Sequence, residues 1–588
     1  MKAKNLFFGA LACLAFAACS NDDDAVMNGV QAEGKAFIAV NLSMPEGAST
    51  RWDNTNNETN YKEGETYEVE VNDVKLYFFN NAGNSWCTAI DVNPTEWKDV
   101  DGDTESASDT TFHMRSDIVV ALENVTESNY PTKVVAVLNG PTLATDEYAT
   151  LELLSKNVEK SLNTIKLDNE KKFTETKGNF VMSNSGYYNG DSYVNYTTVT
   201  KSNFGTDKDL LKAQKLAIKN PVKIVVERVL ARVSVDLEEG NKNVMTAVQD
   251  LPLADGNTYS VYAIANGWWL DQTNTQSNLV KRYVSMPTFS NWTNWNHPEY
   301  FRSYWAYAVN YNETDDADEA LFQHYRYENA KYNVNDKYCY ENTNSTYPTR
   351  LCVSANLYTY DGSSYSKVED LIQWQYYYYN SIASFKTAVL SYLTTANEGA
   401  SVVTKSGAAL VAEDIKLVWN TYGEPSSVTH DYQAIVQLSA ATGDFEINGV
   451  DRSIEEVNNH LKSVIGEFKY WNGGQTYYWT PIVHNADESL NGIIRNHLYK
   501  INVKSLAGLG TPVPSDPDKD DPKDPTDPTD PTDPEVPTDP TDPDNPDDPD
   551  PDKPIDPETP EDDKVSAIAT EIVILEYRVV SQDVDLGK

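Results

Sequence analysis

The chain has 588 residues, which is enough for two or three domains with a sizeable core. Its formal net charge of −42, with no basic patch to offset it, excludes nucleic acid as a partner. The 37 tyrosines and the frequent Thr, Val and Asn favour strands and polar loops over helices, so we expect a mainly β fold.

Residues 1–19 have the features of a lipoprotein signal peptide. Lys2 and Lys4 precede an apolar run from Leu6 to Ala18, which is too short for a permanent membrane helix. Small residues then lead to Cys19, which we expect to carry lipid, such as palmitate, as the first residue of the mature lipoprotein. An ordinary secretory signal with a chance cysteine is the alternative. The acidic residues that follow Ser20 are either a surface-export signal or a flexible tether.

The clearest strand of the N-terminal half follows this leader. One face of the predicted strand carries Ala36, Ile38, Val40, Leu42 and Met44, which alternate with the other side chains. A polar loop comes next and contains the first arginine of the chain, Arg51, where a protease has access. Residues 36–44 are therefore either a removable strand or a permanent core strand.

Further strands are predicted in the N-terminal half at residues 67–71, 74–79, 118–122 and 133–139. A helix is expected over residues 145–163, with Leu151, Leu154, Val158 and Leu162 at helical spacing. The half from residue 52 to 215 is expected to be a β-sandwich with a small helical insertion.

A second β-sandwich is expected from residue 216 to 510. It opens with a strand run over residues 222–235 and includes strands at 259–266, 477–485 and 494–504. Helices are expected from Ser381 to Ala396 and from Ser453 onward. At the second of these, Glu456 lies three residues after Ser453, as in a capping box.

An acidic spacer, residues 511–564, separates this unit from the C-terminus. Pro and Asp recur every two or three residues, which favours an extended polyproline-type chain. About 50 residues at about 3.1 Å each reach roughly 160 Å. The spacer can therefore carry the terminal segment to a neighbour, and the same slack allows insertion into its own chain.

The terminal segment, residues 565–588, is predicted to be a strand without a partner in the sequence. Val573, Leu575, Tyr577 and Val579 share one face, and the phase changes after Val580, which suggests two strand segments joined by a kink. A tethered apolar strand would aggregate if left free, so it must dock in a sheet. We expect it to be a donor strand that joins copies of this protein.

Several segments in this order resemble the fimbrillins, the structural subunits of type V pili in Bacteroidales, and most of all the major subunit of the short, Mfa-type fimbria. The acidic cluster after Cys19 resembles the surface-export signal of Bacteroidota lipoproteins. Besides the leader, the spacer and the terminal strand, the matching segments are Asn41-Leu42-Ser43-Met44-Pro45, Val225-Val226-Glu227-Arg228, Ala231-Arg232 and Arg495-Asn496-His497-Leu498-Tyr499-Lys500-Ile501.

The resemblance implies two tandem transthyretin-like β-sandwich domains and a maturation step. A lipoprotein precursor reaches the outer membrane, and an arginine-specific protease cuts after Arg51. The propeptide, residues 20–51, then leaves with its strand, and the terminal strand of another copy fills the groove. Accessory anchor and tip subunits are the other implied partners. Trp52, beside the bond to be cut, departs from the family pattern and would slow cleavage.

No catalytic or metal motif is evident, so we expect neither an enzyme nor a cofactor. Cys339 and Cys352 either form a disulfide bridge or are free thiols, and Cys87 is expected to be a free thiol. The aromatic run from Trp374 to Tyr379 and the pair Trp268 and Trp269 either stack on sugars or pack in a core.

The function expected from the sequence is that of a structural subunit of a cell-surface fimbria, in the shaft, that supports adhesion and virulence. The alternative is a monomeric surface lipoprotein that binds glycans through aromatic loops.

Overall fold

The computed structural model describes residues 35–40, 61–62, 68, 571–575 and 577–586, together with most of residues 71–513. Within 71–513 the gaps are 93–97, 100–111, 117, 127, 160–179, 189–191, 208–209, 240–241, 244, 283–295, 298–301, 304–305, 312–321, 324–335, 345–346, 362, 396–401, 406, 421–432, 440–444, 486–489 and 507. The described part is mainly β, as expected.

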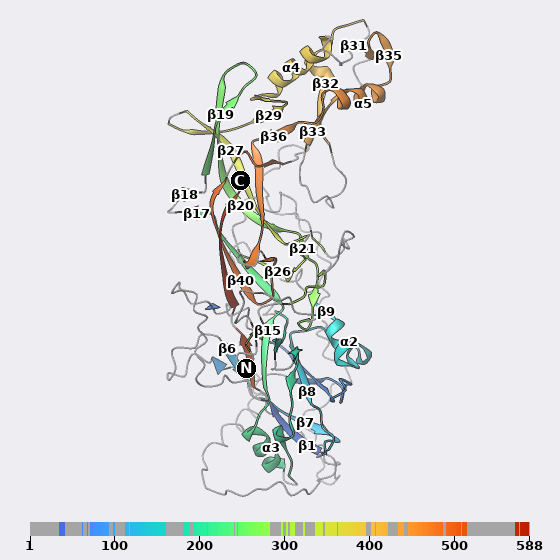
Figure 1. Ribbon diagram of the computed structural model, residues 1–588, viewed down its shortest axis with the longest axis vertical. Coiled ribbons are helices and arrows are strands. Elements are labelled where there is room, and N and C mark those ends of the chain that lie inside the picture. Colours follow the sequence, from blue (N-terminus) through green and yellow to red (C-terminus); the bar gives the residue numbers. More distant parts are fainter. Residues whose placement is uncertain are drawn as a thin grey trace, which may run out of the picture.

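Three large hydrophobic cores organise the described residues. Figure 1 shows them along the long axis of the molecule, with the N-terminal strands at the bottom, the second β unit in the middle and the unit that carries α4 (Ile382–Thr394) and α5 (Ile454–Val464) at the top. No helix among the described residues combines the length and apolar character that a membrane crossing requires.

The N-terminal unit contains a large and a small sheet that share one core. In spatial order, the large sheet consists of β4 (Ile90–Val92), β3 (Val74–Phe79), β8 (Lys133–Leu138), β10 (Met182–Asn184), β15 (Lys223–Arg228), β42 (Glu571–Leu575), β6 (Phe112–Ser116) and β5 (Lys98–Asp99), with β13 (Thr197–Thr198) beside β8. The small sheet consists of β14 (Phe204–Gly205), β1 (Lys35–Val40) and β7 (Ile118–Glu123).

The second unit also has two main sheets, around a separate core. One contains, in order, β2 (Tyr61–Lys62), β43 (Tyr577–Leu586), β40 (His497–Leu506), β16 (Leu230–Asp236) and β26 (Lys337–Tyr340). The other contains β19 (Met245–Pro252), β20 (Thr258–Asp271), β27 (Arg350–Tyr360), β37 (Gln475–Pro481) and β41 (Thr511–Pro512), with β28 (Tyr365–Lys367) beside β27.

The third core lies between α4, α5 and small sheets inserted into the second unit. These sheets are β30 (Tyr377–Tyr379), β29 (Asp370–Trp374) and β36 (Lys469–Asn472); β31 (Val403–Lys405), β34 (Phe445–Ile447) and β35 (Val450–Arg452); and β32 (Ile415–Asn420) with β33 (Gln433–Leu438). Two-stranded pairs elsewhere are β11 (Tyr187–Tyr188) with β12 (Tyr193–Val194), β17 (Glu238–Glu239) with β18 (Lys242–Asn243), β21 (Thr273–Asn274) with β25 (Phe322–Gln323), β22 (Ser277–Asn278) with β9 (Val158–Glu159), β23 (Asn296–His297) with β24 (Arg302–Ser303), and β38 (Val483–Asn485) with β39 (Leu490–Asn491).

The predicted helices at 381 and 453 are confirmed. Ser381 and Ser453 are the N-caps of α4 and α5, and both accept a hydrogen bond from a backbone N–H three residues on. At α5 the Glu456 carboxylate accepts in return from the Ser453 N–H at 2.9 Å, so the capping box is complete.

The helix predicted over 145–163 is wrong from Asn157 to Glu159, and its last part, 160–163, lies outside the described residues. A 3₁₀ turn (Thr145–Tyr148) precedes α2 (Leu151–Lys156), and Asn157 is already extended. Val158 then pairs with Asn278 of β22. A β-branched residue with a strand partner prefers the sheet, which ends the helix although the apolar spacing continues.

The sequence did not predict α3 (Leu210–Lys219), which lies against β1 and β14. Its buried positions are the small residues Ala213 and Ala217, which give little hydrophobic signal. The approach is so close that a Cβ added at Gly205 of β14 would lie 1.9 Å from the Ala213 carbonyl oxygen.

The predicted strand run over 222–235 is interrupted at Val229. β15 pairs with β10 in the N-terminal unit, whereas β16 pairs with β40 in the second unit. The domain boundary expected between residues 215 and 216 falls inside α3, before β15. The chain passes from one sheet to the other at Val229, whose side chain is fully buried.

Candidate strand-docking site

The terminal segment crosses both units. β42 runs parallel to β15, with Val573 opposite Val225, and pairs on its other side with β6. β43 then runs parallel to β40, from Arg578 opposite His497 to Leu586 opposite Leu506. We call β42 and β43 together the tail, and we call the edges of β15 and β40 that it occupies the tail path. In Figure 1 the terminal strands appear dark red beside β15 and β40.

The four residues predicted to form the donor face lie in these two strands, Val573 and Leu575 in β42 and Tyr577 and Val579 in β43. The prediction of two segments is confirmed, but the predicted joint after Val580 is wrong, since β42 ends at Leu575 and β43 runs through Val580 without a break. The tail must pass between β42 and β43 from the sheet of one unit to the sheet of the next, which a single regular strand does not do. Val584 is buried in the second core.

A short strand covers the outer edge of the docked tail. Tyr61 and Lys62 of β2 pair antiparallel with Arg578 and Tyr577 of β43. β2 lies ten residues after Arg51 in the sequence, so it belongs to the new N-terminal segment if the chain is cut there. The tail is thus held between β40 and the segment that follows the expected cleavage point.

Glu68 fixes the same segment at the junction of the two units. The Glu68 carboxylate is fully buried, accepts from Arg232 at 3.3 Å and also accepts from the Tyr338 hydroxyl. Its backbone carbonyl accepts from Nε of Arg228 at 2.9 Å. Burial would lower the pKa of Arg232, but Glu68, Tyr338 and Asp336 outweigh it and raise that pKa.

The strand predicted over 67–71 is therefore wrong at Glu68, which lies in a 3₁₀ turn. The alternation Tyr-Glu-Val-Glu-Val is typical of a half-buried strand, but strand propensity depends on context. Here two buried arginines bind the carboxylate and the main chain of Glu68, and these contacts decide its conformation.

Arg228, the last residue of β15, connects this strand to the second unit. Its Nη1 donates to Oδ1 of Asn496 at 3.1 Å, and the Asn496 N–H donates to the Leu230 carbonyl at 3.0 Å. Asn496 adopts a positive φ of 54°, which asparagine tolerates better than most residues. The turn before β40 is thus held against the point where β15 gives way to β16.

Two further ion pairs are buried beside this junction. Arg495 pairs with Glu341 at 2.6 Å, and Lys281 pairs with Glu227 at 2.6 Å. Burial lowers the pKa of Lys281 although Glu227 opposes the effect. Removing one partner of such a pair costs about 3–5 kcal/mol, because the other charge stays buried without compensation.

The residues that carry the sequence resemblance meet here. Glu227, Arg228, Arg232 and Arg495 come from three separate segments and converge at the junction of the units. The resemblance to the fimbrillins singled out these residues but did not give their role, since charged residues in strands are usually solvent-exposed.

β1 occupies a different place from the tail. It lies between β7 and β14, with Ile38 opposite Val120 on one side and Phe204 on the other. Three residues of the predicted removable strand, Ala36, Ile38 and Val40, are in β1; Leu42, Met44, Arg51 and Cys19 lie outside the described residues. The molecule thus contains two strand positions within its N-terminal unit, one filled by β1 and one by β42.

The three described cysteines are free thiols, so Cys339 and Cys352 form no bridge. Burial raises the pKa of Cys339 to about 12 and that of Cys352 well above its usual value. Among the described residues, no cluster of His, Cys, Asp and Glu is arranged to hold a metal ion.

The aromatic segments lie mostly in cores. Trp268, Trp269 and Trp374 are buried, which confirms the packing interpretation for these three. Tyr376 and Tyr377 are exceptions, since Tyr376 is 88% exposed at the turn between β29 and β30 and Tyr377 is 49% exposed.

Residues 469–583 match the model of the family "Major fimbrial subunit protein type IV, Fimbrillin, C-terminal". This segment includes β40, most of the terminal strands and the spacer between them. The chain is of the fimbrillin type. Fimbrillins are proteins of cell-surface fimbriae, and the family is one of structural proteins rather than of enzymes.

Three solved structures to which this fimbrillin-type chain is similar are the following. A candidate cell adhesion protein from Bacteroides eggerthii has 14% identity, a TM-score of 0.25 and coverage of 57% of this chain and 78% of that chain. A fimbrial assembly protein from Parabacteroides distasonis has 9% identity, a TM-score of 0.25 and coverage of 70% and 98%. The tip fimbrial protein Mfa3 from Porphyromonas gingivalis has 12% identity, a TM-score of 0.24 and coverage of 57% and 81%. A comparison with curated proteins finds no match.

Proposed function

We propose that this fimbrillin-type protein is a shaft subunit of a short, Mfa-type fimbria and that it polymerises by donor-strand exchange. In the fibre, the tail of one subunit lies along the tail path of its neighbour. The observation that carries the proposal is the pairing of β42 and β43 with the open edges of β15 and β40. These contacts do not require the tail to belong to the same chain as β15 and β40, because residues 514–570 form a long connection between β41 and the tail. The same edges can therefore receive a tail in cis or in trans.

The proposed precursor is a lipoprotein held in the outer membrane through Cys19, and an arginine-specific protease cuts it after Arg51. β2 lies over the docked tail and is connected to β1 on its N-terminal side and to Glu68 on its C-terminal side. A segment held at both ends opens less readily than one with a free end. Cleavage after Arg51 gives β2 a free end, which facilitates replacement of the tail in cis by a tail in trans.

The first test compares a protein that starts at Trp52 with one that starts at Ser20. Only the shorter form should assemble into ladders that resist SDS, and deletion of residues 565–588 should abolish them. If both forms remain monomeric, the proposal is wrong.

A second test identifies the strand position that an incoming tail occupies. One copy carries Val225→Cys and another carries Val573→Cys, at positions that are directly opposite in β15 and β42. After processing and mixing, an intermolecular disulfide is expected. A third copy carries Val120→Cys, in β7 beside the β1 position. A disulfide that forms only with Val120→Cys would show that the tail instead fills the place of β1.

The second candidate function is a monomeric lipoprotein that binds glycans, and the exposed ring of Tyr376 is the observation that favours it. Glycan binding that is lost with Tyr376→Ala, in a protein that never polymerises, would support this function instead.

A further inference from the structure

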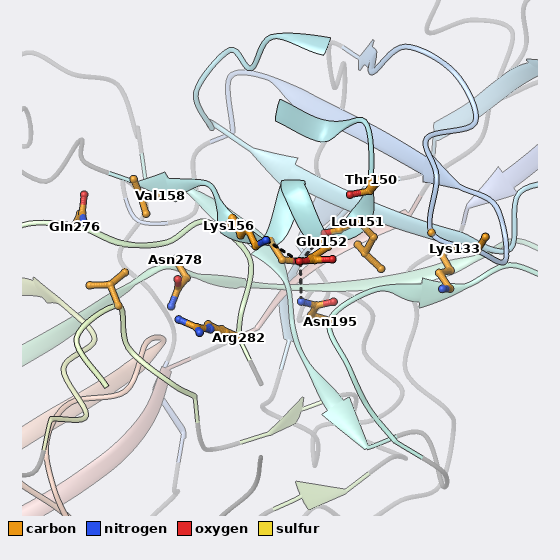
Figure 2. Close-up of a pocket in the computed structure, with 14 residues that line it drawn as sticks. Lys133, Thr150, Leu151, Glu152, Lys156, Val158, Asn195, Gln276, Asn278 and Arg282 are labelled. Carbon is orange, nitrogen blue, oxygen red and sulfur yellow. Dashed lines mark hydrogen bonds and ion pairs between the residues drawn. The ribbon is translucent and has the colours of Figure 1, made fainter. Parts of the chain in front are cut away.

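A cation-lined pocket lies on the face of the N-terminal unit that carries α2. Its volume of about 830 Å³ is in the range of small-ligand sites. Lys156 and Glu152 come from α2, Lys133 from the start of β8, and Arg282 from the segment after β22. Figure 2 shows Lys133 at one side of the pocket and Arg282 at the other, with Lys156 and Glu152 between them. Three cations thus face one carboxylate, in a chain that is strongly acidic overall.

Two of these cations have no carboxylate partner among the described residues. The Lys133 ammonium donates to the Asn81 carbonyl at 3.1 Å and lies 5.0 Å from the centre of the Tyr196 ring. Burial lowers the pKa of Lys133, and no nearby carboxylate offsets that effect. The Arg282 side chain is exposed. An incoming carboxylate would be favoured at Lys133, because it would compensate a partly desolvated charge, and the exposed guanidinium of Arg282 is accessible for a second ion pair.

The third cation can be shared. Lys156 pairs with Glu152 at 2.6 Å, but both side chains are more than half exposed, at 66% and 77%. An exposed pair on a helix surface contributes little stability, so Lys156 can turn toward a ligand at small cost. The pocket is therefore suited to a ligand with two or more separated anionic groups.

The spacer of this protein has anionic groups with that spacing. Asp524, Asp527, Asp530 and Asp533 recur at every third position, in Asp-Pro-Thr repeats. A polyproline II helix has three residues per turn and rises about 3.1 Å per residue, which places these carboxylates on one face at intervals of about 9 Å. The sequence thus encodes a row of carboxylates on a chain that proline keeps extended.

We propose that the pocket binds the Asp-Pro-Thr repeat of this protein, and that in the fibre it binds the repeat of the adjacent subunit. The part about the fibre rests on the proposed strand exchange. Because a docked tail tethers the spacer to its neighbour, the effective concentration of the repeat is high, and a weak ionic contact is sufficient. The contact would hold the slack of the spacer against the shaft.

The test is binding of a fluorescent peptide of residues 521–545 to the full chain. The host protein has Asn in place of Asp524, Asp527, Asp530, Asp533, Asp539 and Asp542, so that its own repeat does not compete. Anisotropy should show binding at 50 mM NaCl that weakens at 300 mM. The double variant Lys133→Gln, Arg282→Gln should bind about tenfold more weakly, since it loses two charge contacts.

The matched control is the double variant Arg452→Gln, Lys462→Gln, which removes the same charge from the exposed surface at α5. It should bind as the host does. A peptide of the same composition, permuted to remove the three-residue period, should bind the host as weakly as the original peptide binds the Lys133→Gln, Arg282→Gln variant.

Three results would overturn the inference. They are equal binding of the permuted peptide, equal weakening by the two double variants, and binding of an acidic oligosaccharide such as oligogalacturonate in the absence of peptide binding. None of them bears on the ladder and disulfide tests, so strand exchange can stand if this inference fails.

Discussion

The two strand segments at the ends of the chain are held in different ways. β1 lies in the middle of a small sheet of the N-terminal unit, where it pairs with β7 and β14. The tail contacts two units, since β42 pairs with β15 in one sheet and β43 pairs with β40 in another, as β15 and β16 themselves belong to these two sheets. The difference indicates that β1 stabilises one unit, whereas the tail connects the two.

Deletion of residues 565–588 should have the largest effect on this comparison. It leaves the edges of β15 and β40 open and exposes the apolar surface that the tail covers, at a cost of several kcal/mol at roughly 25 cal/mol per Å². In calorimetry, the full chain should unfold with its two β units coupled, and the deletion should separate their transitions.

The matched control for this deletion is the protein that starts at Trp52, which lacks β1 but keeps the tail. It should lower the temperature of the coupled transition without splitting it. A single transition that persists after deletion of the tail would mean that the buried junction, not the tail, couples the units.

Substitutions at the junction should have the next largest effect. Arg228→Ala removes the guanidinium that donates to Oδ1 of Asn496 and to the Glu68 carbonyl, and Glu68→Gln removes the negative charge between two buried arginines. Each should destabilise the folded chain by about 3 kcal/mol, as measured by urea unfolding.

The control pair is Arg452 and Glu456, which is exposed and joined at 3.3 Å. Arg452→Ala should cost less than about 1 kcal/mol. Equal effects at the two pairs would contradict a structural role for the junction.

A smaller effect is expected from one proline in each end segment. Ile38→Pro removes an N–H donor from β1, and Val579→Pro removes one from β43, beside Leu498 of β40. Ile38→Pro should leave the ladders of the processed form intact, because the processed chain has lost β1. Val579→Pro should reduce the ladders, which are measured on SDS gels, while it leaves the transition of the third core unchanged.

The sequence predicted regular elements where the local signals agree. β3 has the bounds that its apolar run predicts, and α5 begins at the capping box of Ser453 and Glu456. It failed where a distant partner decides the structure. Val158 leaves the helix for a strand partner in β22, and Glu68 leaves a strand pattern for two arginines that are more than 150 residues away.

The same limit applies to the docking site. The tail was predicted to be a strand from its alternation alone, but the edges that receive it belong to β15 and β40, which no local pattern marks as unpaired. The point where the tail changes sheets was also missed, because the end of β42 at Leu575 depends on which sheet each segment joins rather than on the side-chain phase.

The smallest expected effect uses native thiols as reporters of each segment. Cys87 packs against the N-terminal core, in which β1 docks, and Cys339 lies in β26 of the sheet that receives β43. Burial, with a smaller contribution from Glu123, raises the pKa of Cys87 to about 11, and burial raises that of Cys339 to about 12. Since the thiolate is the reactive form, both should label slowly with maleimide at pH 8.

The two truncated forms should change one reporter each. The protein that starts at Trp52 should label faster at Cys87, and the protein without residues 565–588 should label faster at Cys339. Because both pKa values are raised in the folded state, the unfolded chain loses its thiol protons first, and the stability of both forms should fall as the pH rises from 9 toward 11. Labelling that accelerates at both cysteines in both forms would mean that β1, like the tail, affects both units.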